Sequence, residues 1–210
     1  RRPGRETLTR CGTTRSPRPA HLQRFAPTLI RSLDRALHYT QSVLAYGRAV
    51  ESNPQKRVIR LRLLVDDVFE MMAGLDDRVQ FANEVPPDLE MEVDPDHFHR
   101  AVANLVRNAI QAFENDADEA LVRRVVVDAV DVDGEEVRIG VQDTGPGLSA
   151  RARENLFKAF RGSTRAGGTG LGLAIAAEIV QAHGGSIHHV EGHSPGARFE
   201  IVVGKRDSRM

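Results

Sequence analysis

A long helix with a sharply marked start limits how this chain can fold. Asp94 is of a residue type that caps helix N-termini, and Pro95 is favoured at the first helical position. Apolar residues then recur at three- and four-residue steps: Phe98, Val102, Leu105, Ala109 and Phe113. Because a helix with one apolar face must bury it against another element, we predict a helix over 95–113 that covers one face of a sheet.

Short segments on both sides of this helix predict the strands of that sheet: 57–63, 78–85, 89–93, 122–131, 136–142, 186–190 and 197–203. Asp133-Gly134 lies between two of them and is typical of a hairpin turn. Further helices are predicted over 64–73 and 170–183, and 143–168 is predicted as a loop. The expected fold class is therefore α+β, with a mixed, mostly antiparallel sheet and helices on one face.

The first fifty residues differ from the rest. Residues 1–20 are rich in arginine and proline, which predicts a disordered or artefactual leader. Residues 21–51 show leucines at helical spacing, and this pattern ends at the breaker cluster Glu51-Ser52-Asn53-Pro54. A lone helix of this length is marginal in water, so its apolar stripe needs a partner in this chain or in another subunit. We expect a leader over 1–20, one helix within 21–52 and a domain over 56–205.

Composition narrows the functional classes. Lys+Arg and Asp+Glu each number 29, so the formal net charge is zero and gives no support for a nucleic-acid partner. Cys11 is the only cysteine, which excludes an intramolecular disulfide and suits a reducing compartment. No apolar run reaches the length of about 18 residues that predicts a membrane-spanning helix. We expect a cytoplasmic location, with a membrane-anchored parent protein as an open alternative.

A polar face of the helix over 95–113 carries the first chemical signal. Asn104 and Asn108 lie one turn apart, although asparagine is a mediocre helix former. The carbonyl oxygen of an asparagine side chain is a good ligand for Mg²⁺, which takes few ligands from the protein. Two asparagines that merely face solvent are the alternative interpretation.

Two glycine-rich segments carry the second and third signals. Asp143-Thr144-Gly145-Pro146-Gly147 directly follows a predicted strand, where a carboxylate can accept a hydrogen bond from an exocyclic amine. Gly167-Gly168-Thr169-Gly170-Leu171-Gly172 leads into the helix over 170–183, whose free N–H groups suit phosphate. Taken alone, each segment is also compatible with an ordinary tight turn or loop, and the second matches neither standard phosphate-binding fingerprint.

The order and spacing of these motifs resemble the ATP-binding domain shared by sensor histidine kinases, DNA gyrase-type ATPases, the chaperone Hsp90 and mismatch-repair ATPases. The matching segments are Asn104–Ala109 (N box), Asp143–Gly147 (G1 box), Leu156–Phe160 (F box), Gly168–Gly172 (G2 box) and the terminal Gly196-Ala197-Arg198-Phe199. The resemblance covers about residues 57–204. It implies a two-layer α/β sandwich of the Bergerat type, with ATP and Mg²⁺ as ligands.

The resemblance also implies a role for each matching residue. Asp143 looks like the acceptor for the adenine amino group, with Gly145 and Gly147 beside it, and Asn108 looks like the Mg²⁺ ligand. Asn104 should meet the nucleotide or its water.

The remaining candidates surround the phosphates. Residues 148–169 resemble a mobile ATP lid, and Arg161 and Arg165 are either its phosphate contacts or two solvated arginines. The expected phosphate-binding turn comprises Gly168, Thr169, Gly170, Leu171 and Gly172.

Asn104 separates the branches of this family. Gyrase-type ATPases have at this position a glutamate that activates water, whereas an asparagine cannot take a proton, so transfer to another nucleophile is favoured over hydrolysis. We therefore assign the catalytic position to Asn104. The stretch Asn104–Phe113 resembles histidine kinases of the nitrogen-regulation type, although Gln111-Ala112 stands where many relatives have Lys-Tyr. That difference puts one phosphate contact in doubt, which Arg107 or a lid arginine would have to replace.

In histidine kinases a dimerising two-helix hairpin precedes the ATP domain, and its first helix bears the phospho-accepting histidine. Residues 21–51 resemble the second helix of such a hairpin, and a homodimer through 21–51 is possible. None of the 8 histidines lies in a phospho-acceptor motif. We therefore expect transfer of the γ-phosphoryl group to a histidine outside this chain, with a response regulator receiver domain as a further partner.

Two rival functions remain. A degenerate adaptor of the same fold would have lost nucleotide binding, which the intact Asp143, Asn108 and glycine motifs disfavour. A hydrolytic ATPase or a Ser/Thr kinase of the same fold is disfavoured by Asn104 and by the helix predicted over 21–51.

Overall fold

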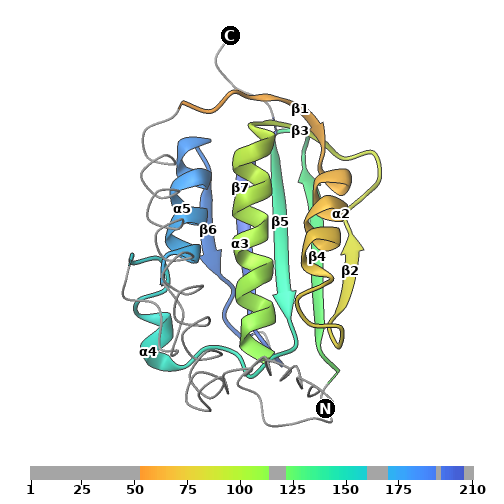
Figure 1. The fold of residues 1–210 in the computed structure, drawn as a ribbon. Helices are drawn as coiled ribbons and strands as arrows, with labels where there is room; N and C mark the ends of the chain where they lie inside the picture. Colours follow the sequence, from red (N-terminus) through yellow and green to blue (C-terminus); the bar gives the residue numbers. More distant parts are fainter. Residues whose placement is uncertain (1–52, 114–121, 160–169, 193–194, 206–210) are drawn as a thin grey trace, which may run out of the picture. The chain divides into compact units, whose positions relative to one another are not determined.

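The computed structural model describes residues 53–113, 122–159, 170–192 and 195–205 (Figure 1). All of these residues belong to one compact unit of the chain. The leader expected over 1–20 and the helix expected over 21–51 lie outside the described residues.

A five-stranded sheet forms the base of this unit. In spatial order its strands are β2 (Gln80–Glu84), β4 (Arg124–Val132), β5 (Glu136–Asp143), β7 (Arg198–Gly204) and β6 (Ser186–His189). β2 runs parallel to β4, and every other neighbouring pair is antiparallel. Two further strands, β1 (Arg57–Arg60) and β3 (Glu90–Val93), pair antiparallel as a separate ribbon. The predicted mixed, mostly antiparallel sheet is confirmed.

Three helices cover one face of the sheet, as Figure 1 shows: α2 (Leu61–Met72), α3 (Pro95–Phe113) and α5 (Gly172–Ala182). α3 is the central one and lies beside both of the others. Its start, its end and its buried apolar stripe agree with the prediction from the sequence. The α+β class with helices on one face is therefore confirmed.

The core lies between these helices and the sheet. Alternate residues of the three central strands point into it and are buried: Val125, Val127, Val137, Ile139, Val141, Phe199, Ile201 and Val203. On β4 and β7 the intervening positions are more exposed, which is the two-residue period of a sheet with one covered face. The β4–β5 hairpin turns where predicted, because Asp133 and Gly134 both adopt positive φ values, 53° and 76°.

Two differences from the prediction are larger than a shift of one or two residues at the end of an element. The expected strand over 57–63 ends at Arg60, and α2 begins at Leu61 instead of residue 64. Leu61 is fully buried and starts the helical stripe that continues through Leu64 and Val65, so core packing overrides the local alternation. The expected loop over 143–168 contains a short helix, α4 (Ala150–Arg153), whose N-cap Ser149 accepts a hydrogen bond from the Ala152 N–H.

Candidate functional site

The asparagine pair lies on the side of α3 that the core does not fill. Asn104 and Asn108 are half-buried and lie one turn apart. The side-chain nitrogen Nδ2 of Asn104 is shielded from solvent and, among the described residues, has no hydrogen-bond partner. The alternative of two solvated asparagines therefore does not fit Asn104. A shielded amide without a partner is costly, and a ligand with an acceptor oxygen would satisfy it.

The glycine-rich turn meets Asn104 at the start of α5. A Cβ atom added at Gly172 would lie 3.8 Å from Oδ1 of Asn104, so the two elements approach closely there. Gly170 has a φ of 65°, a conformation that glycine adopts without strain, and Leu171 is fully buried behind the turn. The N–H groups in the first turn of α5 lack partners within the helix, as at any helix start.

Asp143 ends β5 and is only 3% exposed. Its Oδ1 accepts hydrogen bonds from the Gly145 N–H at 2.9 Å and the Ala197 N–H at 3.3 Å. The Asp143 N–H in turn donates to the Ala197 carbonyl at 2.9 Å. Two backbone segments thus fix the orientation of this carboxylate.

Glycines make this close packing possible. At Gly196, with a φ of 93°, any Cβ would overlap the Asp143 carbonyl oxygen. A Cβ at Gly145 would lie 3.0 Å from Asp143 Oδ1 and 3.2 Å from the Ala112 Cβ on α3. The loop after β5 therefore lies against the C-terminal end of α3.

The three motifs meet along one side of α3. Asn104, Asn108 and Ala112 are spaced at four-residue steps, so they lie on one face of the helix. Gly172 lies beside Asn104, and Gly145 lies beside Ala112. Asn108 is therefore between the glycine-rich turn and the Asp143 loop. These residues are far apart in sequence, and only the packing of α3 brings them together.

Several expected site residues cannot be compared with the structure. Arg161, Arg165, Gly168 and Thr169 lie outside the described residues, as does Phe160 of the F box. Phe157 is described; it is half-buried, and its ring is 6.3 Å from that of Phe199 in an edge-on arrangement, in keeping with a packing role.

Sequence reasoning did not assign individual roles to Thr144 and Ala197. Thr144 Oγ1 donates to the Val122 carbonyl at 2.6 Å and accepts from the Arg124 N–H at 2.9 Å, which ties the Asp143 loop to the start of β4. Ala197 acts through its backbone alone, so its side chain gives no signal in the sequence. The neighbouring Gly196 was recognised in the sequence only as part of the terminal motif Gly196-Ala197-Arg198-Phe199.

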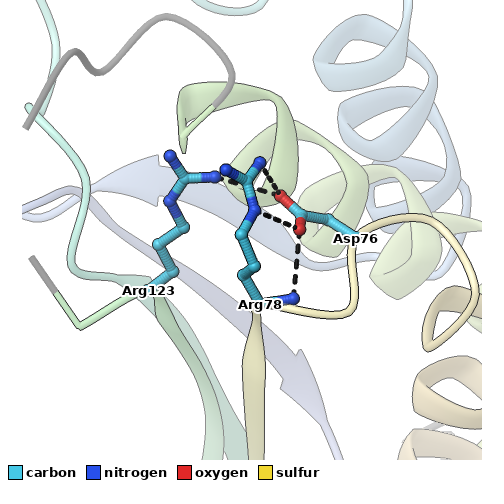
Figure 2. Close-up of polar contacts among 3 residues, drawn as sticks. All are labelled: Asp76, Arg78 and Arg123. Carbon is cyan, nitrogen blue, oxygen red and sulfur yellow. Dashed lines mark hydrogen bonds and ion pairs between the residues drawn. The ribbon is translucent and has the colours of Figure 1, made fainter. Parts of the chain in front are cut away.

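An ion cluster fixes the chain just before β4 (Figure 2). The Asp76 carboxylate accepts from Arg78 Nε at 2.9 Å and from Arg123 Nη1 at 3.1 Å. The hydrogen bond from the Arg78 side chain is the main reason why the pKa of Asp76 falls to about 2. The Arg123 carbonyl accepts from the Gln80 N–H at 2.8 Å, so the cluster joins β4 to β2.

The metal candidate depends on the asparagines. Among the described residues, no group of three or more His, Cys, Asp or Glu side chains could hold a metal ion. Asn108 and Asn104 offer amide oxygens, which fit a hard cation that takes most of its ligands from phosphate and water.

No helix within the described part of the chain is long and apolar enough to cross a membrane.

A family profile and a curated relative both match this chain and both include histidine kinases. The sequence profile described as "Histidine kinase-, DNA gyrase B-, and HSP90-like ATPase" matches residues 93–207. The sensory histidine kinase/phosphatase NtrB of Escherichia coli O157:H7 is 35% identical over 179 residues, which cover 81% of this chain and 49% of NtrB. The chain thus spans about half the length of this relative.

Solved structures of ShkA and of the histidine kinase ThkA have the same fold. Full-length ShkA in complex with AMPPNP has a TM-score of 0.70 and 26% identity, covering 88% of this chain and 39% of ShkA. The catalytic domain of ThkA has a TM-score of 0.62 and 28% identity, covering 72% of this chain and 97% of that domain. ThkA in complex with the response regulator TrrA has a TM-score of 0.68 at 23% identity, covering 89% of this chain and 52% of that ThkA chain.

Proposed function

Since this chain belongs to the family of histidine kinase-, DNA gyrase B- and HSP90-like ATPases, we propose that it is the ATP-binding catalytic part of a sensor histidine kinase. It would bind Mg·ATP and pass the γ-phosphoryl group to a histidine outside this chain. One observation carries the proposal most directly: Asn104, Asn108 and Ala112 line one side of α3, with Gly172 at one end and the Asp143 loop at the other. The kinase domain would extend over 56–205.

Asp143 would recognise the adenine base. The N–H groups of Gly145 and Ala197 hold its Oδ1, so the carboxylate is oriented before a ligand arrives. As in the related domains, it would accept a hydrogen bond from the adenine amino group. Gly145 and Gly147 would let the backbone approach the base, because neither carries a side chain.

Asn104, Asn108 and the start of α5 would face the phosphates. Asn108 would give one amide oxygen to Mg²⁺, and the Nδ2 group of Asn104, which is shielded and lacks a partner among the described residues, would donate to a phosphate oxygen or to a water. Gly170, Leu171 and Gly172 would present N–H groups at the helix start. Gly168, Thr169 and Arg161 are proposed as further phosphate contacts from residues outside those described.

Phosphoryl transfer is favoured over hydrolysis at this site. The Asn104 side chain is an amide and cannot take a proton from water, which a hydrolytic ATPase requires at this position. The residues present would act by binding and orienting the triphosphate and by stabilising negative charge. Bound Mg²⁺ would add charge neutralisation between the phosphates.

The partners follow from the proposed reaction. The acceptor histidine would lie on a helical hairpin of the parent protein or of a partner chain, and residues 21–51 would supply one helix of it and a dimer contact. A response regulator receiver domain would take the phosphoryl group next, as the complex of ThkA with TrrA suggests for that kinase. Because ATP is the substrate, we place the domain in the cytoplasm.

Thermal unfolding with and without Mg·AMPPNP tests nucleotide binding. A ligand that binds only the folded state must raise Tm, and the rise depends on ligand concentration over Kd. We expect a clear rise for the wild type and little for Asp143→Asn. The Asn side chain retains an oxygen for the Gly145 and Ala197 N–H groups but presents a donor where adenine needs an acceptor. No rise at millimolar nucleotide in the wild type would favour the adaptor.

Radiolabelled ATP distinguishes the remaining functions. Mixed with a hairpin that supplies the acceptor histidine, the chain should produce acid-labile label on that hairpin, and Asp143→Asn should not. Steady phosphate release without any acceptor would identify an ATPase instead. Acid-stable label on a serine or threonine would identify a Ser/Thr kinase.

A further inference from the structure

A buried polar contact joins α3 to α5 at the end of α3 remote from Asp143. Asp94 and His183 are 8% and 6% exposed. Asp94 caps α3, because its Oδ1 accepts from the N–H groups of Asp96 and His97, both at 3.1 Å. His183 directly follows Ala182, the last residue of α5. The proposed nucleotide contacts do not use either residue.

His183 bridges the two helices through both ring nitrogens. Its Nε2 accepts from the Asp94 N–H at 3.0 Å, and its Nδ1 lies 2.7 Å from the Ile179 carbonyl of α5. Only the neutral imidazole with a proton on Nδ1 can make both hydrogen bonds at once. The ring also packs edge-on against Phe98 of α3, with the ring centres 4.9 Å apart.

A second contact shows how the two helices are aligned. Asn104 lies beside Gly172. Asn104 comes ten residues after Asp94, the residue before α3, and Gly172 comes eleven residues before His183, the residue after α5. At a rise of 1.5 Å per residue, both contacts are separated by roughly 15 Å along each helix. α3 and α5 therefore run in opposite directions, and α5 lies along the first half of the longer α3 (Figure 1). A slip at His183 would move Gly172 along Asn104 by the same amount.

We infer that His183 is a positioning residue of the nucleotide site, because its hydrogen bond to the start of α3 sets the register that holds Asn104 beside Gly172. This inference rests on the proposed function, since it assigns His183 to the same site. An apolar side chain could fill the same space but would leave the Asp94 N–H without its acceptor. A hydrogen bond is directional, so it fixes the sliding position of two helices as apolar packing alone does not.

The contact requires a neutral His183. Burial lowers the pKa of His183 below its ordinary value, and electrostatic interaction with His97 and Lys56 acts in the same direction. The hydrogen bond with Ile179 and the charge of Asp94 oppose this shift. Protonation of Nε2 would replace the acceptor with a donor that faces the Asp94 N–H, so the register should loosen at acid pH.

Two substitutions at this position separate positioning from packing. His183→Leu keeps the volume but removes both hydrogen bonds. His183→Gln keeps one acceptor and one donor on a neutral group and cannot be protonated in this pH range. Phe81→Leu is the matched control, because it disturbs the packing of β2 against Phe69 of α2, away from α5.

Calorimetric titration of the full chain with Mg·AMPPNP measures the effect. At pH 7.5 we expect His183→Leu to weaken binding about tenfold, because the free protein no longer holds Asn104 beside Gly172, and His183→Gln to stay close to the wild type. From pH 7.5 to 5.5 the wild type should lose affinity more steeply than His183→Gln. The inference is wrong if His183→Leu binds no more weakly than a Phe81→Leu protein of equal Tm, or if the two pH profiles coincide.

A readout without nucleotide keeps this inference separate from the proposed function. In NMR spectra of the free protein, His183→Leu should shift the Asn104 side-chain amide and the Gly172 N–H, whereas Phe81→Leu should not. If the wild type fails to bind AMPPNP but these signals shift, the function is wrong and the register role stands. If the signals stay in place, the register role is wrong whatever the nucleotide does.

Discussion

At the scale of single residues, Asn108 is the position where a metal-dependent effect should appear. It lies between Asn104 and Ala112, on the face of α3 that these three residues share. We predict that Asn108→Ala weakens AMPPNP binding about tenfold in Mg²⁺, roughly 1.4 kcal/mol, and leaves binding in EDTA unchanged. The rise in Tm with AMPPNP, measured in both buffers, checks this. Gln181→Ala on the exposed side of α5 is the control, and an equal loss in both buffers would contradict a metal role.

Asp76 should matter for stability and not for nucleotide binding. Its carboxylate pairs with Arg123, whose side chain is only 10% exposed, so Asp76→Asn leaves a shielded charge without its counterion. We predict a loss of about 1–2 kcal/mol in unfolding free energy at pH 7, measured by urea unfolding.

The pH dependence of this effect has a definite sign. The pKa of Asp76 is held at about 2, below its unfolded value near 3.9, so its contribution is present above about pH 4 and is lost as the pH falls towards 2. The stability difference between wild type and Asp76→Asn should therefore shrink over that range. Glu136→Gln, which removes an exposed pair with Arg138, should change little at either pH.

At the scale of elements, a charged pair crosses the central strand of the sheet. Arg198 on β7 reaches Asp128 on β4 with two hydrogen bonds, at 2.6 and 2.8 Å. The guanidinium group passes over Gly140 of β5, where an added Cβ would overlap it. Three strands are thus held together on the face that the helices leave open.

A double-mutant cycle tests this arrangement. Gly140→Ala should destabilise the wild type by about 1–2 kcal/mol, because the new methyl group displaces the Arg198 side chain. In an Arg198→Ala background the same change should cost little or stabilise, since alanine is a better strand residue than glycine. Urea unfolding of the four proteins gives the coupling energy. Equal costs in both backgrounds would show that the pair does not depend on Gly140.

At the scale of the whole molecule, acid sensitivity should arise from the buried His183 and the half-buried His189 before carboxylates titrate. Burial is the main cause that lowers the pKa of both His183 and His189 below the ordinary value. As the pH falls below the unfolded value of about 6.5, the unfolded chain takes up these protons before the folded chain does. Their contribution to stability is therefore complete above that pH and is lost below it.

This prediction is checked by urea unfolding at pH 7.5, 6.5 and 5.5. The wild type should lose stability with falling pH, and His183→Gln should lose less over the same interval. His188→Gln, at a half-exposed position on β6, is the control and should follow the wild type. Parallel curves for the wild type and His183→Gln would exclude His183 as a source of the acid sensitivity.

Much of the fold can be derived from local pattern. Asp94-Pro95 and a regular apolar stripe fixed both ends of α3, and Asp133-Gly134 fixed the hairpin, because caps and turns are decided by a few neighbouring residues. The predicted boundary between β1 and α2 was wrong, because the burial of Leu61 depends on tertiary contacts that an alternating apolar pattern in the sequence cannot reveal.

The sequence by itself determined which motifs are present and in what order, and from these the family and the fold class. Only the tertiary structure decided that β2 lies parallel to β4, that Ala197 holds Asp143, and that His183 joins the start of α3. These contacts join residues 44, 54 and 89 positions apart. The physical reason is range: periodicity and capping act within one or two turns, whereas backbone partners and helix register depend on the packed whole.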